Sequence, residues 1–535
     1  MSTIPSPPST TVNPPPPSRD VIFFPHHSRD RKIHLRPWLV HIFQGKPHHQ
    51  QINKDTQQQS NTNVDISQTN AAPVTAQTLA SSLSAPTPSS FVSLDLPPTD
   101  STNGRTSLPF AAPTTKESHD DHDVSLLSPE QSAFYANEYG KVEQQLELAS
   151  VLDSMRYRDE TGDIEKRICE KVVFHQVSIH SVDGLVKELQ HQQSQLDFEH
   201  GKSPPSTRSS VPTIVVLNLC DGTESDGYPG VTIARALEAT LTSTDPSHPP
   251  LHFTGADSAF FHTTTDKVTM KKYFADAQPP VRTSRFVDMS DISMESIDPN
   301  HLSANHAALV ASLSSLTFPL IIKPTNSYSS CGLTDSSVVQ SPIAALQQSQ
   351  VIKKELGSVL AEEYIQGREF SMLIVGDSTR DDVAAQSLSS PSPLASSSLP
   401  LLVGLRCYSP AERAFSSSLS PLHQFLTFEQ NYPTKFTTPR TWWQKHDSPN
   451  RESEQAAMVH LACQAYTACR GRSYGRIDIR QSSSTGEFYI LEVNSLPGIS
   501  GELDSSVGAI LHHADTKFGQ FLYSILHLAV ERRLD

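Results

Sequence analysis

Near its C-terminal end the chain carries two segments, Arg476–Arg480 and Ile490–Asn494, in which polar and apolar residues alternate. Alternation with a period of two is typical of a strand that buries one of its faces. Residues 482–486 between the two segments are Ser, Ser, Ser, Thr and Gly, which favour a turn. We therefore predict an antiparallel hairpin, with its turn centred on Thr485.

This turn sets the side chains that face each other across the hairpin. Asp478 is expected opposite Glu492, and Arg476 opposite Asn494, all on one face of the sheet. Two opposed carboxylates destabilise a strand pair. Mg²⁺ relieves the conflict because it takes oxygen ligands and is commonly held by one or two carboxylates and substrate phosphates. The alternative is a hairpin whose charges are simply solvated, and the hairpin alone does not decide between the two.

Composition indicates that much of the chain does not fold. The 535 residues include 40 prolines, and residues 1–127 are dominated by Pro, Ser, Thr and Gln tracts. Such segments bury too little apolar surface to offset the entropy lost on ordering. We expect residues 1–127 to be a disordered low-complexity region and residues 377–400 to be a disordered insertion within the fold.

Charge and cysteine usage limit the classes of partner. A formal net charge of −15 argues against a general nucleic-acid or membrane surface. The six cysteines form no CxxC pair, which fits a reducing compartment. No apolar run approaches the ~18 residues of a membrane span. The N-terminus lacks the layout of a secretory signal, so we expect a cytoplasmic protein. The alternative is an organelle presequence, which the basic stretch Arg29–Arg36 leaves open.

Between residues 171 and 324 the pattern changes to alternating strands and helices. The continuous apolar run 211–218 is typical of a strand buried in a parallel sheet. A second apolar strand, Phe318–Pro324, carries Lys323 at its end, followed by the Ser-rich stretch 325–332. Backbone amides and hydroxyls of such a loop can close over phosphates, and a lysine supplies charge. These features predict an α/β nucleotide-binding protein.

Five motifs follow one another in a characteristic order: Asp266-Lys267, Lys323-Pro324 before the Ser-rich loop, the run 362–369 (EEYIQGRE), the run 475–479 (GRIDI) and the run 492–498 (EVNSLPG). In this order the chain resembles the ATP-grasp ligases, and among them the D-alanine–D-alanine ligase branch. The resemblance covers roughly residues 210–535 and is carried most specifically by the last two runs.

The resemblance implies an α/β (α+β) ATP-grasp fold that follows a Rossmann-like domain. On that basis we expect a helix and α/β domain over 128–256, a central ATP-grasp subdomain over 257–376 and a C-terminal catalytic subdomain over 401–535.

The resemblance also implies a role for each site residue. Phosphates would be held by Lys267 and Lys323 with Ser329 and Ser330 on the closing loop, adenine by Glu362, Glu363 and Ile365, ribose by Glu369, and magnesium by Asp478, Glu492 and Asn494. Arg476 would stabilise the oxyanion.

The implied reaction is the ATP-dependent joining of a carboxylate to an amine through an acyl phosphate, with ATP and Mg²⁺ (Mn²⁺ as an alternative) and amino-acid-like substrates. The resemblance allows a homodimer. The alternative is a catalytically silent ATP-binding scaffold.

The substrate side of the sequence departs from the family pattern. Cys220-Asp221-Gly222 stands where the family presents a His-Gly pair and an acidic residue. Ser500 and Ser505 are offset from the family's carboxylate-binding serine, and an early glutamate-bearing strand is not recognisable. The product is therefore defined only as a dipeptide or amide.

Overall fold

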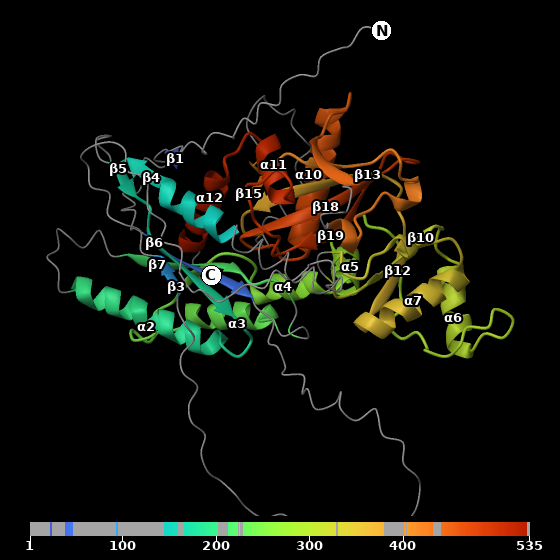
Figure 1. The fold of residues 1–535 in the computed structure, drawn as a ribbon, viewed down its shortest axis with the longest axis horizontal. Coiled ribbons are helices and arrows are strands. Elements are labelled where there is room, and N and C mark those ends of the chain that lie inside the picture. The colour runs from blue at the N-terminus through green and yellow to red at the C-terminus, as the bar shows by residue number, and fades with distance from the viewer. Residues whose placement is uncertain are drawn as a thin grey trace, which may run out of the picture.

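The computed structural model describes residues 22–23, 38–45, 92–94, 144–158, 165–201, 212–222, 224, 228–327, 330–378, 401–402, 404–431 and 440–531. Three groups of elements can be followed in Figure 1. Strands β3, β6 and β7 lie with helices α2 and α3, strands β10 and β12 lie with α6 and α7, and strands β13, β18 and β19 lie between them with α10 and α11.

The first group is a five-stranded sheet in the order β3-β6-β2-β7-β8. Its strands are β2 (Trp38–Gly45), β3 (Val92–Leu94), β6 (Cys169–Val177), β7 (Thr213–Leu219) and β8 (His252–Phe253). All are parallel to their neighbours except β3, which is antiparallel to β6.

The central strand β2 corrects the prediction for residues 1–127. Disorder was expected there, yet Trp38–Gly45 pairs with β6 on one side and β7 on the other. Val40 and Ile42 are fully buried. A strand in the middle of a parallel sheet has no exposed edge, and Trp38, Val40 and Ile42 of this strand belong to the core.

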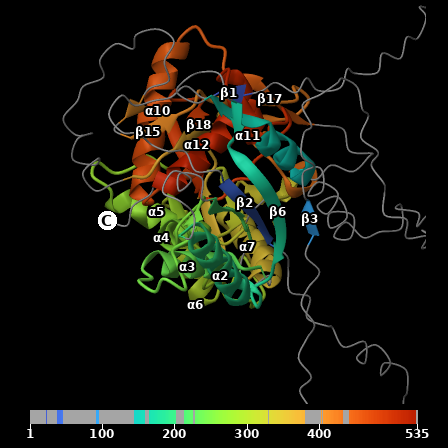
Figure 2. The same ribbon diagram turned by 90° about the vertical axis from the view of Figure 1, so that its left-hand side faces the viewer.

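Helices cover both faces of this sheet, as Figure 2 shows for α2 and α3 below β2 and β6 and for α11 and α12 above. One face packs on α2 (Val182–Gly201) and α3 (Gly230–Leu241). The other packs on a helix over 144–154, on α11 (Ser506–His513) and on α12 (Phe518–Glu531). Helix α2 ends at Gly201, and Leu196 in its second half still packs on the core.

The second group is an antiparallel four-stranded sheet in the order β11-β10-β12-β9. Its strands are β9 (Phe286–Asp288), β10 (Leu320–Pro324), β11 (Val338–Val339) and β12 (Val359–Glu363). Helices α6 (Ala304–Leu313) and α7 (Pro342–Leu356) cover one face through a shared apolar core.

The third group is a seven-stranded sheet formed by β13 (Gly367–Val375), β14 (Leu401–Leu402), β15 (Leu405–Cys407), β16 (Ala411–Phe415), β17 (Thr441–Lys445), β18 (Tyr474–Ser482) and β19 (Phe488–Asn494). Helices α4 (Ser258–Thr265), α5 (Lys267–Asp276) and α10 (Arg451–Ala468) pack on one face.

The predicted hairpin is β18–β19, and its register is confirmed at the site end. Asp478 pairs with Glu492, and Arg476 pairs with Asn494. A bulge between Asp478 and Ile479 then shifts the pairing by one residue, so that Ile479 pairs with Ile490.

The apolar segments 359–365 and 369–375, separated by Gln366-Gly-Arg, predict a second β pair, and this prediction is wrong. β12 pairs with β10 and β9, whereas β13 pairs with β18 over nine residues and with β16. The bend at 366 therefore carries the chain from one sheet to the other. The central subdomain expected over 257–376 therefore contributes β13 to the seven-stranded sheet.

Among the described helices, none has the length and apolar character needed to cross a bilayer.

The burial of β2 generates a stability prediction. Ile42→Ala removes a fully buried side chain between two sheet neighbours and should cost about 2–5 kcal/mol of unfolding free energy, measured by urea denaturation. The control Val351→Ala, at a half-exposed position of α7, should stay within about 0.5 kcal/mol. Equal midpoints for the two variants would contradict the placement of β2 in the core.

Candidate active site

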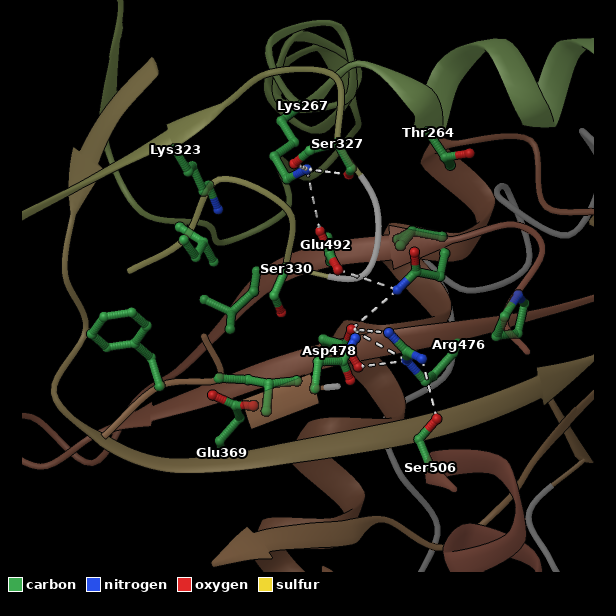
Figure 3. Close-up of a pocket in the computed structure, with 18 of the residues that line it drawn as sticks. Thr264, Lys267, Lys323, Ser327, Ser330, Glu369, Arg476, Asp478, Glu492 and Ser506 are labelled. Atoms are coloured by element: carbon green, nitrogen blue, oxygen red, sulfur yellow. Dashed lines mark hydrogen bonds and ion pairs between the residues drawn. The ribbon is translucent and has the colours of Figure 1, made fainter. Parts of the chain in front are cut away.

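A cavity of about 450 Å³ lies between the four-stranded and seven-stranded sheets. Figure 3 shows side chains from both sheets pointing into it. Every sequence-predicted site residue that the structure describes lines this cavity: Lys267, Lys323, Ser330, Glu362, Glu363, Ile365, Glu369, Arg476, Asp478, Glu492 and Asn494. Ser329 lies outside the described residues.

The β18 strand contributes the central ion pair. The Asp478 carboxylate accepts hydrogen bonds from Arg476 Nε at 2.9 Å and Nη2 at 2.8 Å, and from Ser371 Oγ at 2.5 Å. Burial would raise the pKa of Asp478, but Arg476 and Ser371 outweigh it, so the pKa is lowered and the carboxyl stays ionised. Arg476 is in turn held at its other end by Ser506, with Nη1 3.1 Å from Ser506 Oγ.

The Asn494 amide links the two carboxylates. Its Nδ2 donates to Asp478 Oδ2 and to Glu492 Oε1, each at 3.2 Å. The two acceptor oxygens can therefore be no farther apart than twice that distance, and they share one sheet face, as the hairpin predicted. The amide nitrogen occupies the position where repulsion between the carboxylates would be greatest.

The donor set fits a magnesium ion whose remaining ligands are phosphate oxygens and water. In the described part of the chain no three His, Cys, Asp or Glu side chains gather as a metal site. Asp478 and Glu492 supply two carboxylates, and rotation of the Asn494 amide would present its oxygen between them. Mg²⁺ is usually held by one or two carboxylates plus phosphates and water, so two suffice.

Two lysines, Lys267 and Lys323, line the same cavity as Asp478 and Glu492. Lys267, the first residue of α5, places Nζ 3.8 Å from Glu492 Oε2 and 3.0 Å from the Ser327 carbonyl oxygen. Burial lowers the pKa of Lys267, and Glu492 partly offsets this effect. Helix α5 begins here because the Asp266 side chain accepts a hydrogen bond from Thr269 N.

Lys323 and Lys271 share one carboxylate. Glu362 is 2% exposed and receives Lys323 Nζ at 2.5 Å on one oxygen and Lys271 Nζ at 3.0 Å on the other. Burial would raise its pKa, but the two ammonium groups lower it to about 2. The expected adenine role of Glu362 therefore has to coexist with two ion pairs.

The other glutamates of the motif are also ion-paired. Glu369 accepts from Arg413 Nε at 3.0 Å and from Arg480 Nη2 at 2.9 Å. Arg480 also donates to the Ile365 carbonyl at 2.8 Å. Glu363 pairs with Arg285. The arginines fix these side chains at the cavity wall.

Sequence reasoning missed Lys271, Ser371, Arg413, Arg480 and Ser506 as parts of the site. A signal was present for Arg480, which alternates with Asp478 on one strand face. Lys271 lies four residues after Lys267 on a helix, and that spacing alone does not distinguish a buried counter-ion from a surface lysine.

Comparison with protein families finds a match that covers most of the residues lining the cavity. Residues 287–390 and 412–526 match the family model for the D-ala D-ala ligase C-terminus. The protein y4sG of Sinorhizobium fredii, described as uncharacterized, is 30% identical over 188 residues. That match covers 35% of this chain and 45% of y4sG, so the chain spans under half the length of that relative.

Solved structures of low sequence identity are similar to the chain. The VanG D-Ala:D-Ser ligase of Enterococcus faecalis is 19% identical, with 59% of this chain and 72% of that chain covered and a TM-score of 0.40. The D-alanine–D-alanine ligase of Bacillus anthracis, complexed with ATP, is 16% identical, with 64% and 93% covered and a TM-score of 0.39. The D-alanyl-alanine synthetase A of Vibrio cholerae is 13% identical, with 60% and 78% covered and a TM-score of 0.41.

The lowered pKa of Glu362 generates a prediction of pH dependence. A carboxyl with a folded-state pKa of about 2, against an ordinary value of 4.5, stabilises the fold above pH 4.5 and loses that contribution as pH falls towards 2. The stability difference between the wild type and Glu362→Gln should therefore be constant above pH 5. It should shrink by up to about 1.4 kcal/mol per pH unit below 4.5, measured by urea midpoints.

The control for this series is Glu355→Gln, at an exposed position of α7, which should change the midpoint little at any pH. A Glu362→Gln difference that does not vary between pH 7 and pH 3 would show that the two lysines do not hold the carboxylate in its ionised form.

Proposed function

We propose that this chain, which is ATP-grasp and D-Ala–D-Ala ligase-like over residues 287–390 and 412–526, joins a carboxylate to an amine with consumption of ATP. The proposed product is a dipeptide or amide formed through an acyl phosphate.

One observation carries this proposal. A continuous series of ion pairs and hydrogen bonds crosses the cavity floor from Lys267 through Glu492, Asn494 and Asp478 to Arg476, and Figure 3 shows its course. Cations thus stand at both ends of a pair of opposed carboxylates. Lys267 at one end can bind the phosphates of a nucleoside triphosphate, and Arg476 at the other end can bind the oxygen of a reacting carbonyl.

The nucleotide is proposed to bind with its phosphates between the lysines and the hairpin. Lys267 and Lys323 both reach the cavity, and Ser330 borders it from the adjoining loop. Asp478, Glu492 and Asn494 would hold Mg²⁺. When bound, the ion would neutralise charge on the phosphate oxygens and orient the terminal phosphate for in-line transfer.

The proposed reaction has two steps, and Arg476 acts in the second. A substrate carboxylate attacks the terminal phosphorus of ATP and releases ADP, which leaves an acyl phosphate. The amine adds to the carbonyl carbon, and negative charge develops on the carbonyl oxygen. Arg476 is fixed by Asp478 and Ser506 at the two sides of its guanidinium, so it can stabilise that charge without reorganising. Collapse of the adduct expels phosphate and forms the amide, and the amine loses a proton.

The substrate end of the cavity is proposed to lie at the start of α11. Ser505 caps this helix by accepting from Gly508 N at 2.9 Å, and Ser506 contacts Arg476. Both serines line the cavity. A helix N-terminus beside an arginine favours a carboxylate, which fits an amino-acid substrate. Ser500, the other serine considered from the sequence, instead donates to Glu147.

The amino-acid substrates can be found with a panel of D- and L-amino acids. Each is incubated, singly and in pairs, with the protein, ATP and Mg²⁺, and released phosphate is measured. Phosphate release that depends on a particular pair supports the ligase. ATP binding without release under any pair would favour the silent scaffold instead.

Replacement of Arg476 tests the oxyanion role. Arg476→Ala removes a positioned donor and should lower kcat by at least 10²–10³-fold. ATP binding should persist, because the lysines remain. The control Arg282→Ala changes a half-exposed arginine that pairs with Glu487 and should keep near-normal turnover. Near-normal turnover of Arg476→Ala would remove the assigned role.

A further inference from the structure

The loop between β19 and α11 forms the substrate end of the cavity wall. Pro497 and Gly498 line the cavity on one side of this loop, and Asp504, Ser505 and Ser506 line it on the other. Residues 499–503 between them do not border the cavity. What holds residues 499–503 in place therefore determines where both lining segments lie.

The helix over 144–154 forms hydrogen bonds with residues 499–501 of this loop. The Glu147 carboxylate accepts from Ser500 Oγ at 2.8 Å with one oxygen and from Gly501 N at 2.7 Å with the other. One turn earlier, Gln144 Nε2 donates to the Ile499 carbonyl at 2.8 Å. Positions three apart share a helix face, so three consecutive loop residues are bound by one face of one helix.

The adjoining apolar contacts fix the distance between helix and loop. Leu148 and Leu152 are fully buried in the same core cluster as Ile499. A Cβ atom at Gly501 would lie 2.8 Å from a Glu147 oxygen and 3.0 Å from Phe518. A side chain at position 501 would therefore require the Glu147 carboxylate to shift.

Hydrogen bonds connect residues 500–502 of the loop to Ser505, and the next residue contacts Arg476. Ser505 Oγ donates to the Ser500 carbonyl at 3.2 Å and to the Glu502 carbonyl at 2.8 Å. The next residue, Ser506, holds Arg476. Glu147 does not line the cavity, and both of its oxygens have partners within the protein.

We propose that Glu147 is a positioning residue, which fixes the 499–505 loop and thereby sets the N-terminus of α11 and Ser506 against Arg476. The kinetic part of this inference rests on the proposed ligase function. It assigns to the helix over 144–154, which packs on the five-stranded sheet, control over how the amine-bearing substrate is held.

The test uses hydrogen exchange on the full-length protein, which does not depend on turnover. In Glu147→Ala, backbone amides of residues 498–508 should exchange at least about tenfold faster, because two hydrogen bonds to a charged acceptor are lost. Glu147→Gln retains an oxygen for Gly501 N and a donor for Ser500 Oγ, so it should stay within about twofold of the wild type. The control Leu146→Ala, at a half-exposed position of the same helix, should not alter the loop.

Kinetics then separate positioning from a merely structural contact. Glu147→Ala should raise KM for the amine substrate about tenfold, leave KM for ATP unchanged, and be rescued by Glu147→Gln. If Glu147→Ala does not fold, Gly501→Ala displaces the same carboxylate from the loop side and should give the same shifts.

Loop exchange at the wild-type rate in Glu147→Ala would overturn the proposal. So would faster exchange with KM for the amine unchanged. If the wild type turns over no substrate, the ligase function fails, and the exchange rates still decide whether Glu147 fixes the loop.

Discussion

The arrangement of the site depends on the placement of two carboxylates, Asp478 and Glu492, opposite each other in one antiparallel ladder. Left alone they would repel and weaken the hairpin. The protein relieves the repulsion with Arg476 on one side, Lys267 on the other and the Asn494 amide between them. Under the proposed function, the same groups would bind the phosphates and stabilise the oxyanion. The same electrostatic problem thus accounts for the stability of the hairpin and for its proposed affinity for a metal–nucleotide complex.

Charge at the nucleotide end is balanced in a similar way. Glu362 is buried between Lys323 and Lys271, and Glu369 lies between Arg413 and Arg480. Removing one partner of a buried pair is costly, commonly about 3–5 kcal/mol, because it leaves an uncompensated charge. Under the proposed function, phosphates would compete with Glu362 for Lys323, while fully buried Lys271 would keep the carboxylate neutralised. The second lysine explains how the first can be available to a ligand.

Sequence patterns predicted the local parts of this structure and missed those that depend on distant contacts. The register at the site end of the β18–β19 hairpin followed from alternation and a five-residue turn, whereas the bulge after Asp478 was not predicted. Strand β2 was missed because its pairing partners lie more than 120 residues away and low-complexity sequence surrounds it. The segments around 366 were paired wrongly because a bend between two strands looks the same in sequence whether or not the strands share a sheet. Lys271 and Glu147 carry no periodic signal, since their roles come from side chains that the fold brings to them. The roles assigned to individual site residues and the cytoplasmic location remain predictions.

The central claim is that the opposed carboxylates hold a divalent cation together with nucleotide phosphates. Mn²⁺ can replace Mg²⁺ at oxygen-ligand sites and is visible by electron paramagnetic resonance, so binding of Mn²⁺ with a non-hydrolysable ATP analogue measures the claim directly. The wild type should bind Mn²⁺ much more tightly when the analogue is present, and Glu492→Gln should weaken that binding at least about tenfold. Mn²⁺ binding that is independent of the analogue, or unchanged in Glu492→Gln, would contradict the account.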